Sequence, residues 1–124
     1  MTTLKDVRTI AIPVTNQDNA LAYYVETLGL EKRLDAVISP TLRWIEVAPA
    51  GASVSIALTP AQGEGVRSTD TGVRFTVPDA VAEHDSMQER GVNVGDLQNW
   101  DGVPPMFSFD DPDGNRFYVV EEMD

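Results

Sequence analysis

The sequence contains no cysteine among its 124 residues, so disulfide bonds and thiolate metal sites are excluded. Its single histidine, His84, cannot by itself supply a site of two histidines and a carboxylate. No apolar run reaches the roughly 18 residues that cross a bilayer. The first residues also lack the apolar core of a signal peptide. We therefore expect a cytoplasmic protein that does not bind membranes.

Basic residues are few, because 9 lysines and arginines face 20 acidic residues and the net charge is −11. This negative field repels phosphate backbones, so we expect no nucleic-acid partner. The same field favours cationic ligands, although an acidic surface can also serve solubility alone. With 42% hydrophobic and 23% charged residues, the composition is that of a globular domain.

Alternating apolar residues predict a first strand at about 9–14. Because Pro13 cannot donate a hydrogen bond to a neighbouring strand, we expect this strand at a sheet edge or a module junction. Residues 15–18 are typical helix caps, and they precede a predicted helix over 20–28 that Gly29 ends. Further strands are predicted at 30–37, 42–47 and 54–58.

The same pattern restarts after the polar stretch 60–71. A strand is predicted over 73–77, and a helix begins at Pro78-Asp79 and continues to about Arg90. The residues Asp111-Pro112-Asp113-Gly114 are typical of a tight turn between the last two strands. The three strands predicted after this helix lie at 92–97, 106–109 and 116–120.

A shift of 63 residues superimposes the two halves. Ile10 falls on Val73 in the strands, and Asn16 falls on Asp79 at the helix caps. The glycine that ends the first helix lands one residue past Gly91. A shared offset across strand, cap and helix end indicates an internal repeat.

This repeat predicts an α+β fold of two tandem βαβββ modules within one domain. One such module has too little core to stand alone, so we expect the two to share a core. The modules are predicted at about 6–59 and 71–124, with a linker at 60–70.

Two stretches resemble the vicinal oxygen chelate superfamily, which contains glyoxalases, bleomycin resistance proteins and extradiol dioxygenases. The first combines Val14 and Asn16 with Ala20–Tyr24 and Leu28-Gly29, and the superfamily usually has aspartate where this chain has Asn16. The second is Phe109–Asn115, which resembles the final hairpin of the superfamily. The resemblance covers nearly the whole chain and implies curved mixed sheets around a cavity.

In the metalloenzymes of this superfamily, histidine, glutamate or glutamine from the first and last strands of each module binds a divalent ion. The resemblance places these positions at Thr9, Ala57, Gly72 and Tyr118, none of which is an ordinary metal ligand. We therefore expect no metal and no other cofactor. His84 has polar neighbours in the second helix, and we interpret it as exposed to solvent.

Strand alternation places Arg74 on the face opposite the helix, where a guanidinium needs a carboxylate. That carboxylate is either Glu46 or an acidic group of the ligand. Trp44 either packs in the core or lines a pocket, as does Phe107, and Trp100 lies in a loop-like stretch at a pocket mouth. The predicted ligand-binding residues are Trp44, Glu46, Arg74, Trp100, Met106 and Tyr118.

The resemblance implies a homodimeric protein that binds a small organic molecule without a metal, with antibiotic-sequestering members as the model. The alternative is a lyase, isomerase or dioxygenase that uses non-standard ligands. For acid–base chemistry only Glu46, Asp110 and Tyr118 are candidates, and no pairing among them assigns a catalytic residue. A third interpretation is a structural or regulatory module with a filled cavity.

Overall fold

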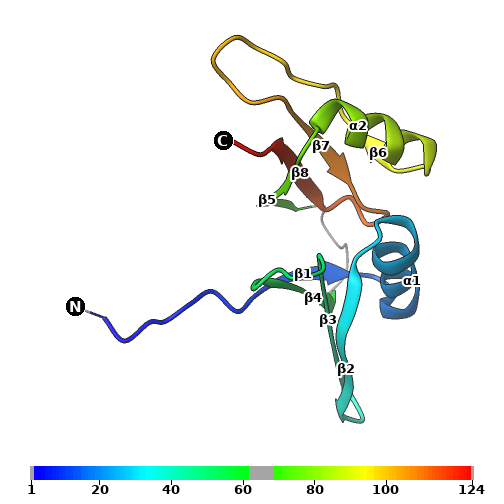
Figure 1. Cartoon of the computed structure of the whole chain (residues 1–124). Helices are drawn as coiled ribbons and strands as arrows, with labels where there is room; N and C mark the ends of the chain where they lie inside the picture. The colour runs from blue at the N-terminus through cyan, green and yellow to red at the C-terminus, as the bar shows by residue number, and fades with distance from the viewer. Residues whose placement is uncertain (1, 62–68, 124) are drawn as a thin grey trace. The chain divides into compact units, whose positions relative to one another are not determined.

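The computed structural model describes residues 2–61 and 69–123, and Figure 1 shows its elements along the chain. The chain divides into two compact units, Met1–Val66 and Arg67–Asp124. Each unit contains one four-stranded mixed sheet and its helix. No helix in the described part of the chain is long and apolar enough to cross a membrane.

The first unit has the strand order β1-β4-β3-β2. The pair β1–β4 is parallel, and the pairs β3–β4 and β2–β3 are antiparallel. The edge position predicted from Pro13 is confirmed, because β1 is the outermost strand. In chain order the elements are β1 (Thr9–Val14), α1 (Gln17–Ala22), the π-helical turn η1 (Tyr23–Thr27), β2 (Glu31–Ser39), β3 (Leu42–Ala48) and β4 (Ser55–Pro60).

The second unit repeats this topology with the order β5-β8-β7-β6. Its parallel pair is β5–β8, and the other two pairs are antiparallel. The predicted α+β arrangement of two βαβββ modules is thus confirmed. The elements are β5 (Asp70–Val77), α2 (Ala80–Glu89), β6 (Asn93–Val94), β7 (Met106–Asp110) and β8 (Arg116–Glu121).

The strand registers follow the internal repeat. Ile12 lies opposite Leu58 in the first sheet, and Phe75, which is 63 residues after Ile12, lies opposite Val119 in the second. The helix caps also correspond, because Asn16 accepts a hydrogen bond from the backbone of Asn19 and Asp79 accepts one from Ala82. The repeat is therefore structural as well as sequential.

Several predicted boundaries differ from the structure. The first helix begins at Gln17 rather than at residue 20, because Asn16 is its cap. The strand predicted at 92–97 is reduced to Asn93–Val94. Gly95 donates a backbone hydrogen bond of 2.7 Å to Ser108, and a Cβ at Gly95 would lie 2.6 Å from the Ser108 hydroxyl. A side chain at Gly95 would therefore require the Ser108 hydroxyl to move.

The structure describes only the two ends of the predicted linker at 60–70. β4 extends to Pro60 and β5 begins at Asp70, so both ends of that stretch belong to strands. Residues 62–68 lie outside the described part of the chain. That the two modules share one core, and enclose a cavity, stays a prediction.

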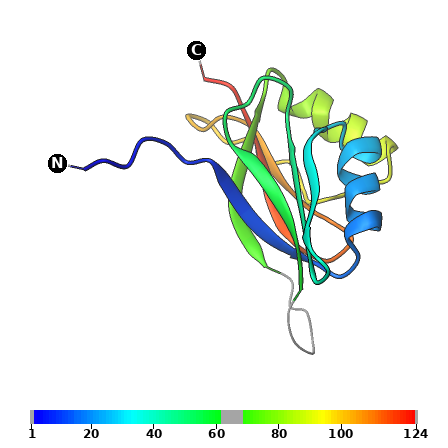
Figure 2. The same ribbon diagram turned by 90° about the horizontal axis from the view of Figure 1, so that it is seen from below.

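Strand alternation gives each sheet one face that packs on its own helix and one that does not, which we call the helix-free face. Figure 2 shows each helix on one side of its sheet. In the second unit, Phe109 and Phe117 stack with ring centroids 5.3 Å apart on the helix side. Both helix-side cores are apolar, and their buried members include Ile12, Val14, Tyr24, Ile56 and Leu58 in the first unit and Met87, Phe107, Phe109, Phe117 and Val119 in the second.

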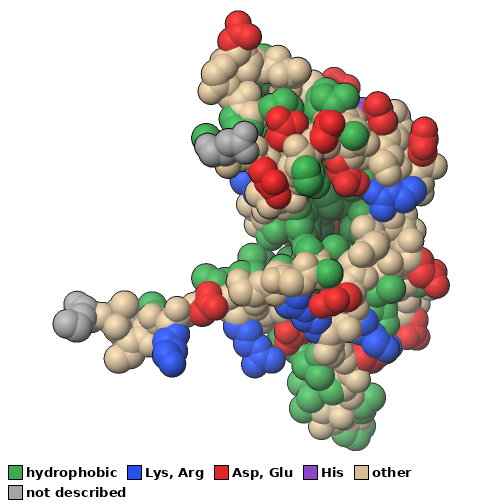
Figure 3. All heavy atoms as spheres, viewed as in Figure 1, with side chains coloured by type: hydrophobic (Ala, Val, Ile, Leu, Met, Phe, Trp, Pro, Cys, Tyr) green, Lys and Arg blue, Asp and Glu red, His purple; other side chains and the backbone are tan. Residues whose placement is uncertain are grey.

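The strand β2 forms an exposed sheet edge. Val37 and Ile38 are 77% and 61% exposed, and Figure 3 shows hydrophobic side chains at the end of the β2–β3 hairpin. Register shifts interrupt the pairing of β2 with β3 between Lys32 and Leu34, and again after Val37. Such irregularities, together with charged side chains, discourage other strands from adding to an open edge.

The turn between β7 and β8 is built around one buried carboxylate. Asp111 accepts hydrogen bonds from the backbone of Asp113 at 2.9 Å and from the backbone of Asn115 at 2.8 Å. The Asn115 amide donates a third at 3.0 Å, and both Asp111 and Asn115 are buried. Gly114 has a φ of 83°, which favours glycine. This part of the motif therefore has a structural role.

We predict that Asp111→Ala lowers the free energy of unfolding by about 3 kcal/mol, because buried donors lose a charged acceptor. Urea denaturation of the purified variant measures the loss. The control is Asp96→Ala, which removes an exposed aspartate from a loop of the same unit. Equal losses in the two variants would contradict the role assigned to Asp111.

Candidate functional site

The helix-free face of the first sheet is organised around Glu46 of β3, whose side chain is buried. The Ser55 hydroxyl donates to Glu46 Oε1 at 2.6 Å. The Trp44 indole N–H donates to Oε2 at 2.8 Å, and the Arg8 guanidinium lies 3.4 Å from the same oxygen. Both carboxylate oxygens therefore have partners from within the first unit.

These donors determine the charge of Glu46. The hydrogen bonds from Ser55 and Trp44 lower the pKa of Glu46 below its usual value, and the positive charge of Arg8 acts in the same direction. Burial of the carboxylate acts to raise its pKa, but the lowering effects are larger. Glu46 is thus ionised at neutral pH, which makes it a poor general acid, and its low basicity makes it a weak general base.

The neighbours of Glu46 on this face are small or polar. Ala57 lies opposite Glu46 across β3–β4 and opposite Ala11 across β1–β4. The Thr9 hydroxyl donates to the backbone oxygen of Ser55 at 3.1 Å. Glu46 therefore has hydrogen-bond donors on one side and the small side chains of Ala57 and Ala11 on the other.

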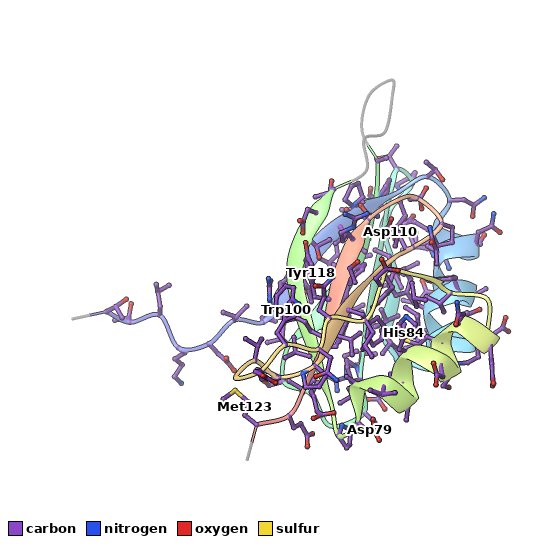
Figure 4. The ribbon with its side chains drawn as sticks, turned by 90° about the horizontal axis from the view of Figure 1, so that it is seen from above. Asp79, His84, Trp100, Asp110, Tyr118 and Met123 are labelled. Carbon is purple, nitrogen blue, oxygen red and sulfur yellow. The ribbon has the colours of Figure 1, made fainter. Side chains whose placement is uncertain are left out.

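The helix-free face of the second sheet has a tyrosine at its centre (Figure 4). The Tyr118 hydroxyl donates to Asp70 Oδ2 at 2.6 Å. The Arg74 guanidinium lies over the Tyr118 ring, 4.5 Å from its centroid, and donates to the backbone oxygen of Gly72 at 2.9 Å. A cation over an aromatic ring is attracted by the π-electrons, so the Tyr118 ring stabilises the position of the Arg74 guanidinium.

The Tyr118–Asp70 hydrogen bond separates the two pKa values. Tyr118 lowers the pKa of Asp70, and the backbone N–H of Gly72 adds to this effect. The bond to Asp70 in turn raises the pKa of Tyr118. At neutral pH the pair is therefore a neutral phenol and a charged carboxylate, and neither is set up to exchange a proton.

The remaining predicted residues of this unit lie at the borders of the face. Asp110 forms a two-point ion pair with Arg116, at 2.9 and 3.2 Å, and so is committed to a protein partner. Met106 lies opposite Val120, at the end of the β7–β8 pair. Trp100 is 61% exposed in the loop before β7, as its loop-like sequence predicts.

Comparison with known proteins agrees with this geometry. A family model of the Glyoxalase/Bleomycin resistance protein/Dioxygenase superfamily matches residues 7–119. The chain belongs to this superfamily. The resemblance that the strand, helix and hairpin motifs indicated is thus confirmed.

Three similar proteins match nearly the whole chain. A structure of a superfamily member from Sphaerobacter thermophilus DSM 20745 is 31% identical with a TM-score of 0.89, over 98% of this chain and all of that one. TnmS3, an antibiotic binding protein from Streptomyces sp. CB03234, is 29% identical with a TM-score of 0.85, over 99% and 100%. YetH of Bacillus subtilis (strain 168) is 28% identical over 119 residues, which are 95% of this chain and 99% of YetH.

The four positions that the resemblance assigns to metal ligands hold Thr9, Ala57, Gly72 and Tyr118. Ala57 and Gly72 have no side-chain ligand atom, and Thr9 and Tyr118 have hydroxyl groups, which are not among the usual ligands of zinc. Across residues 2–61 and 69–123, no three histidine or carboxylate side chains come close enough to hold a metal ion.

One sequence interpretation is wrong, and one alternative that the sequence left open is decided. His84 is not a solvent-exposed residue, because only 16% of its side chain is exposed and its Nε2 lies 3.0 Å from the Gly95 oxygen. Its ring meets Phe107 edge-on, which places Phe107 on the helix side rather than in a pocket. The spacing of Ala80, His84 and Met87 explains this packing, since residues i, i+4 and i+7 share one helix face.

The six predicted ligand-binding residues divide between the units, with Trp44 and Glu46 in the first and the other four in the second. Their role in binding stays a prediction, as does an ion pair between Glu46 and Arg74. Two partners were missed by the sequence reasoning. Arg8 precedes the first predicted strand, and Asp70 falls within the predicted linker. Because neither lay in a predicted strand, their neighbours across the sheet could not be predicted.

We predict that Glu46→Gln lowers the free energy of unfolding by about 2 kcal/mol at pH 7, because a charged acceptor is lost. Since the folded protein lowers the pKa of Glu46, its contribution is present above pH 4.5 and is lost as the pH falls through the folded pKa. The difference between wild type and variant should therefore narrow below that pH in denaturation measurements.

The matched control is Glu26→Gln, which removes the same charge from an exposed position of η1. It should leave stability nearly unchanged at each pH. A wild-type advantage over Glu46→Gln that grows as the pH falls below 4.5 would show that the carboxylate is destabilising in the folded state.

Proposed function

We propose that this protein binds a small organic molecule without a metal ion, and that antibiotics are the first class of ligand to test. The observation that carries the proposal is the similarity to TnmS3, an antibiotic binding protein, at 29% identity over nearly the whole chain. The lack of ligand atoms at Ala57 and Gly72 supports the metal-independent part.

The aromatic side chains supply the apolar surface for such a ligand. Trp100 exposes most of its indole, which is a large apolar area to leave in water. Hydrogen bonding to Asp70 and the stacked Arg74 hold the Tyr118 ring in place. A ring that is already fixed loses little conformational entropy when a ligand packs on it.

An enzyme with unusual ligands is the weaker candidate. Its chemistry would have to use Glu46, Asp110 or Tyr118. The first is held ionised by its donors, the second is paired with Arg116, and the third is a phenol whose pKa is raised. The pKa shifts of Glu46 and Tyr118 thus lead away from the intermediate value that proton transfer near neutral pH favours.

The proposal also includes the setting in which the protein acts. We propose a cytoplasmic homodimer with no nucleic-acid or membrane partner. The net charge of −11 supports the absence of a nucleic-acid partner. Sedimentation or light scattering of the purified chain would test the dimer.

A fluorescence screen of aromatic antibiotics and metabolites tests ligand binding. We expect a ligand to change the emission of Trp100 in the Trp44→Phe variant, because the exposed indole senses what covers it. The Trp100→Phe variant leaves Trp44 of the first unit as the only reporter. A screen in which no compound alters the emission of wild type or either variant would count against the proposal.

Metal content tests the other half of the proposal. Elemental analysis of the purified protein is expected to find less than stoichiometric zinc, iron, manganese and nickel. The decisive variant is Glu46→Ala, which removes the carboxylate of the first helix-free face. If wild type contains a stoichiometric metal and the variant does not, the metal-independent proposal is wrong, and an enzyme with unusual metal ligands becomes the better interpretation.

A further inference from the structure

Arg74 differs from the other arginines that the structure describes. It has no carboxylate partner among the described residues, although 20 of the 124 residues are acidic. Each of the other described arginines forms an ion pair: Arg8 with Glu46, Arg33 with Glu31, Arg43 with Asp18 and Asp35, Arg90 with Glu83, and Arg116 with Asp110.

The side chain is nevertheless held in place. One guanidinium nitrogen donates to the Gly72 backbone oxygen, and the guanidinium carbon lies over the Tyr118 ring. The ring is itself tied to Asp70 by a 2.6 Å hydrogen bond. A guanidinium has five N–H donors, so most of those of Arg74 are left for a further acceptor.

The nearby carboxylates already have other partners. Asp70 accepts hydrogen bonds from the Tyr118 hydroxyl and from the backbone of Gly72. Asp110, on the same face, holds Arg116 through two hydrogen bonds. The second sheet thus positions a cation on its helix-free face without pairing it.

We infer that Arg74 binds a carboxylate group of the ligand, whose apolar part packs near Tyr118. The inference rests on the proposed small-molecule function and specifies its ligand class. A carboxylate matches the planar donor fork of arginine, which can contact both of its oxygens.

The charge around Arg74 favours a monoanion over a phosphate ester. Residues 67–124 contain thirteen acidic and four basic residues, and acidic side chains are spread over this unit in Figure 3. A dianion would be repelled more strongly than a monoanion by this surrounding charge. This also reconciles the acidic composition with an anionic ligand, because Arg74 acts at short range while salt screens distant charges.

The test compares two probes that differ only in charge, 2-naphthoate and 2-naphthamide, by ligand-observed NMR titration. We expect wild type to bind 2-naphthoate about tenfold more tightly, the gain of one charge-assisted contact. Arg74→Gln should abolish this preference, because its affinity for 2-naphthoate should fall to that for 2-naphthamide. Arg74→Lys should retain part of it, because lysine keeps the charge but not the planar fork.

The matched control is Arg90→Gln, which removes the same charge from α2, where Arg90 pairs with Glu83. It should keep the preference for 2-naphthoate, and circular dichroism should show all variants folded. Equal binding of both probes by wild type would overturn the inference and still support the proposed function. A preference that survives in Arg74→Gln, or is lost equally in Arg90→Gln, would overturn it as well. Binding of neither probe would overturn it and also count against the proposed function.

Discussion

The alternation of side chains along each paired strand is the constraint on which the rest of the structure depends. In both units a parallel pair, β1 with β4 or β5 with β8, sets the register. Residues such as Ile12 and Phe75 then pack on the helix side, and the intervening residues form the helix-free face. Because a slip of one residue would exchange the two faces, the register also decides which side chains are available to a ligand.

The helix-free faces contain charged groups that are arranged differently in the two units. In the first, Glu46 is buried and fully engaged by donors of its own unit. In the second, Tyr118 engages Asp70 and leaves Arg74 as a supported cation. Hydrogen bonds lower the pKa of Glu46 and that of Asp70, so both carboxylates are ionised near neutral pH. Neither face has a metal-ligand atom at Ala57 or Gly72.

Local patterns were sufficient to predict the fold, because period-two strands, capped helices and turn residues are encoded by neighbours in sequence. The 63-residue offset then joined them into a repeat, and the registers of Ile12 and Phe75 follow it. What could not be predicted depends on distant neighbours. Asp70 meets Tyr118 only through the pairing of β5 with β8, and Gly95 meets Ser108 only because β6 pairs with β7. The packing of His84 could have been found from its spacing with Ala80 and Met87.

We propose that this superfamily member recognises its ligand with protein side chains alone. The most direct measurement is the affinity for a compound from the fluorescence screen, before and after dialysis against EDTA and after return of zinc, iron, manganese or nickel. Superimposable binding curves are the predicted result. An affinity that falls with chelation and returns with one metal would contradict the claim.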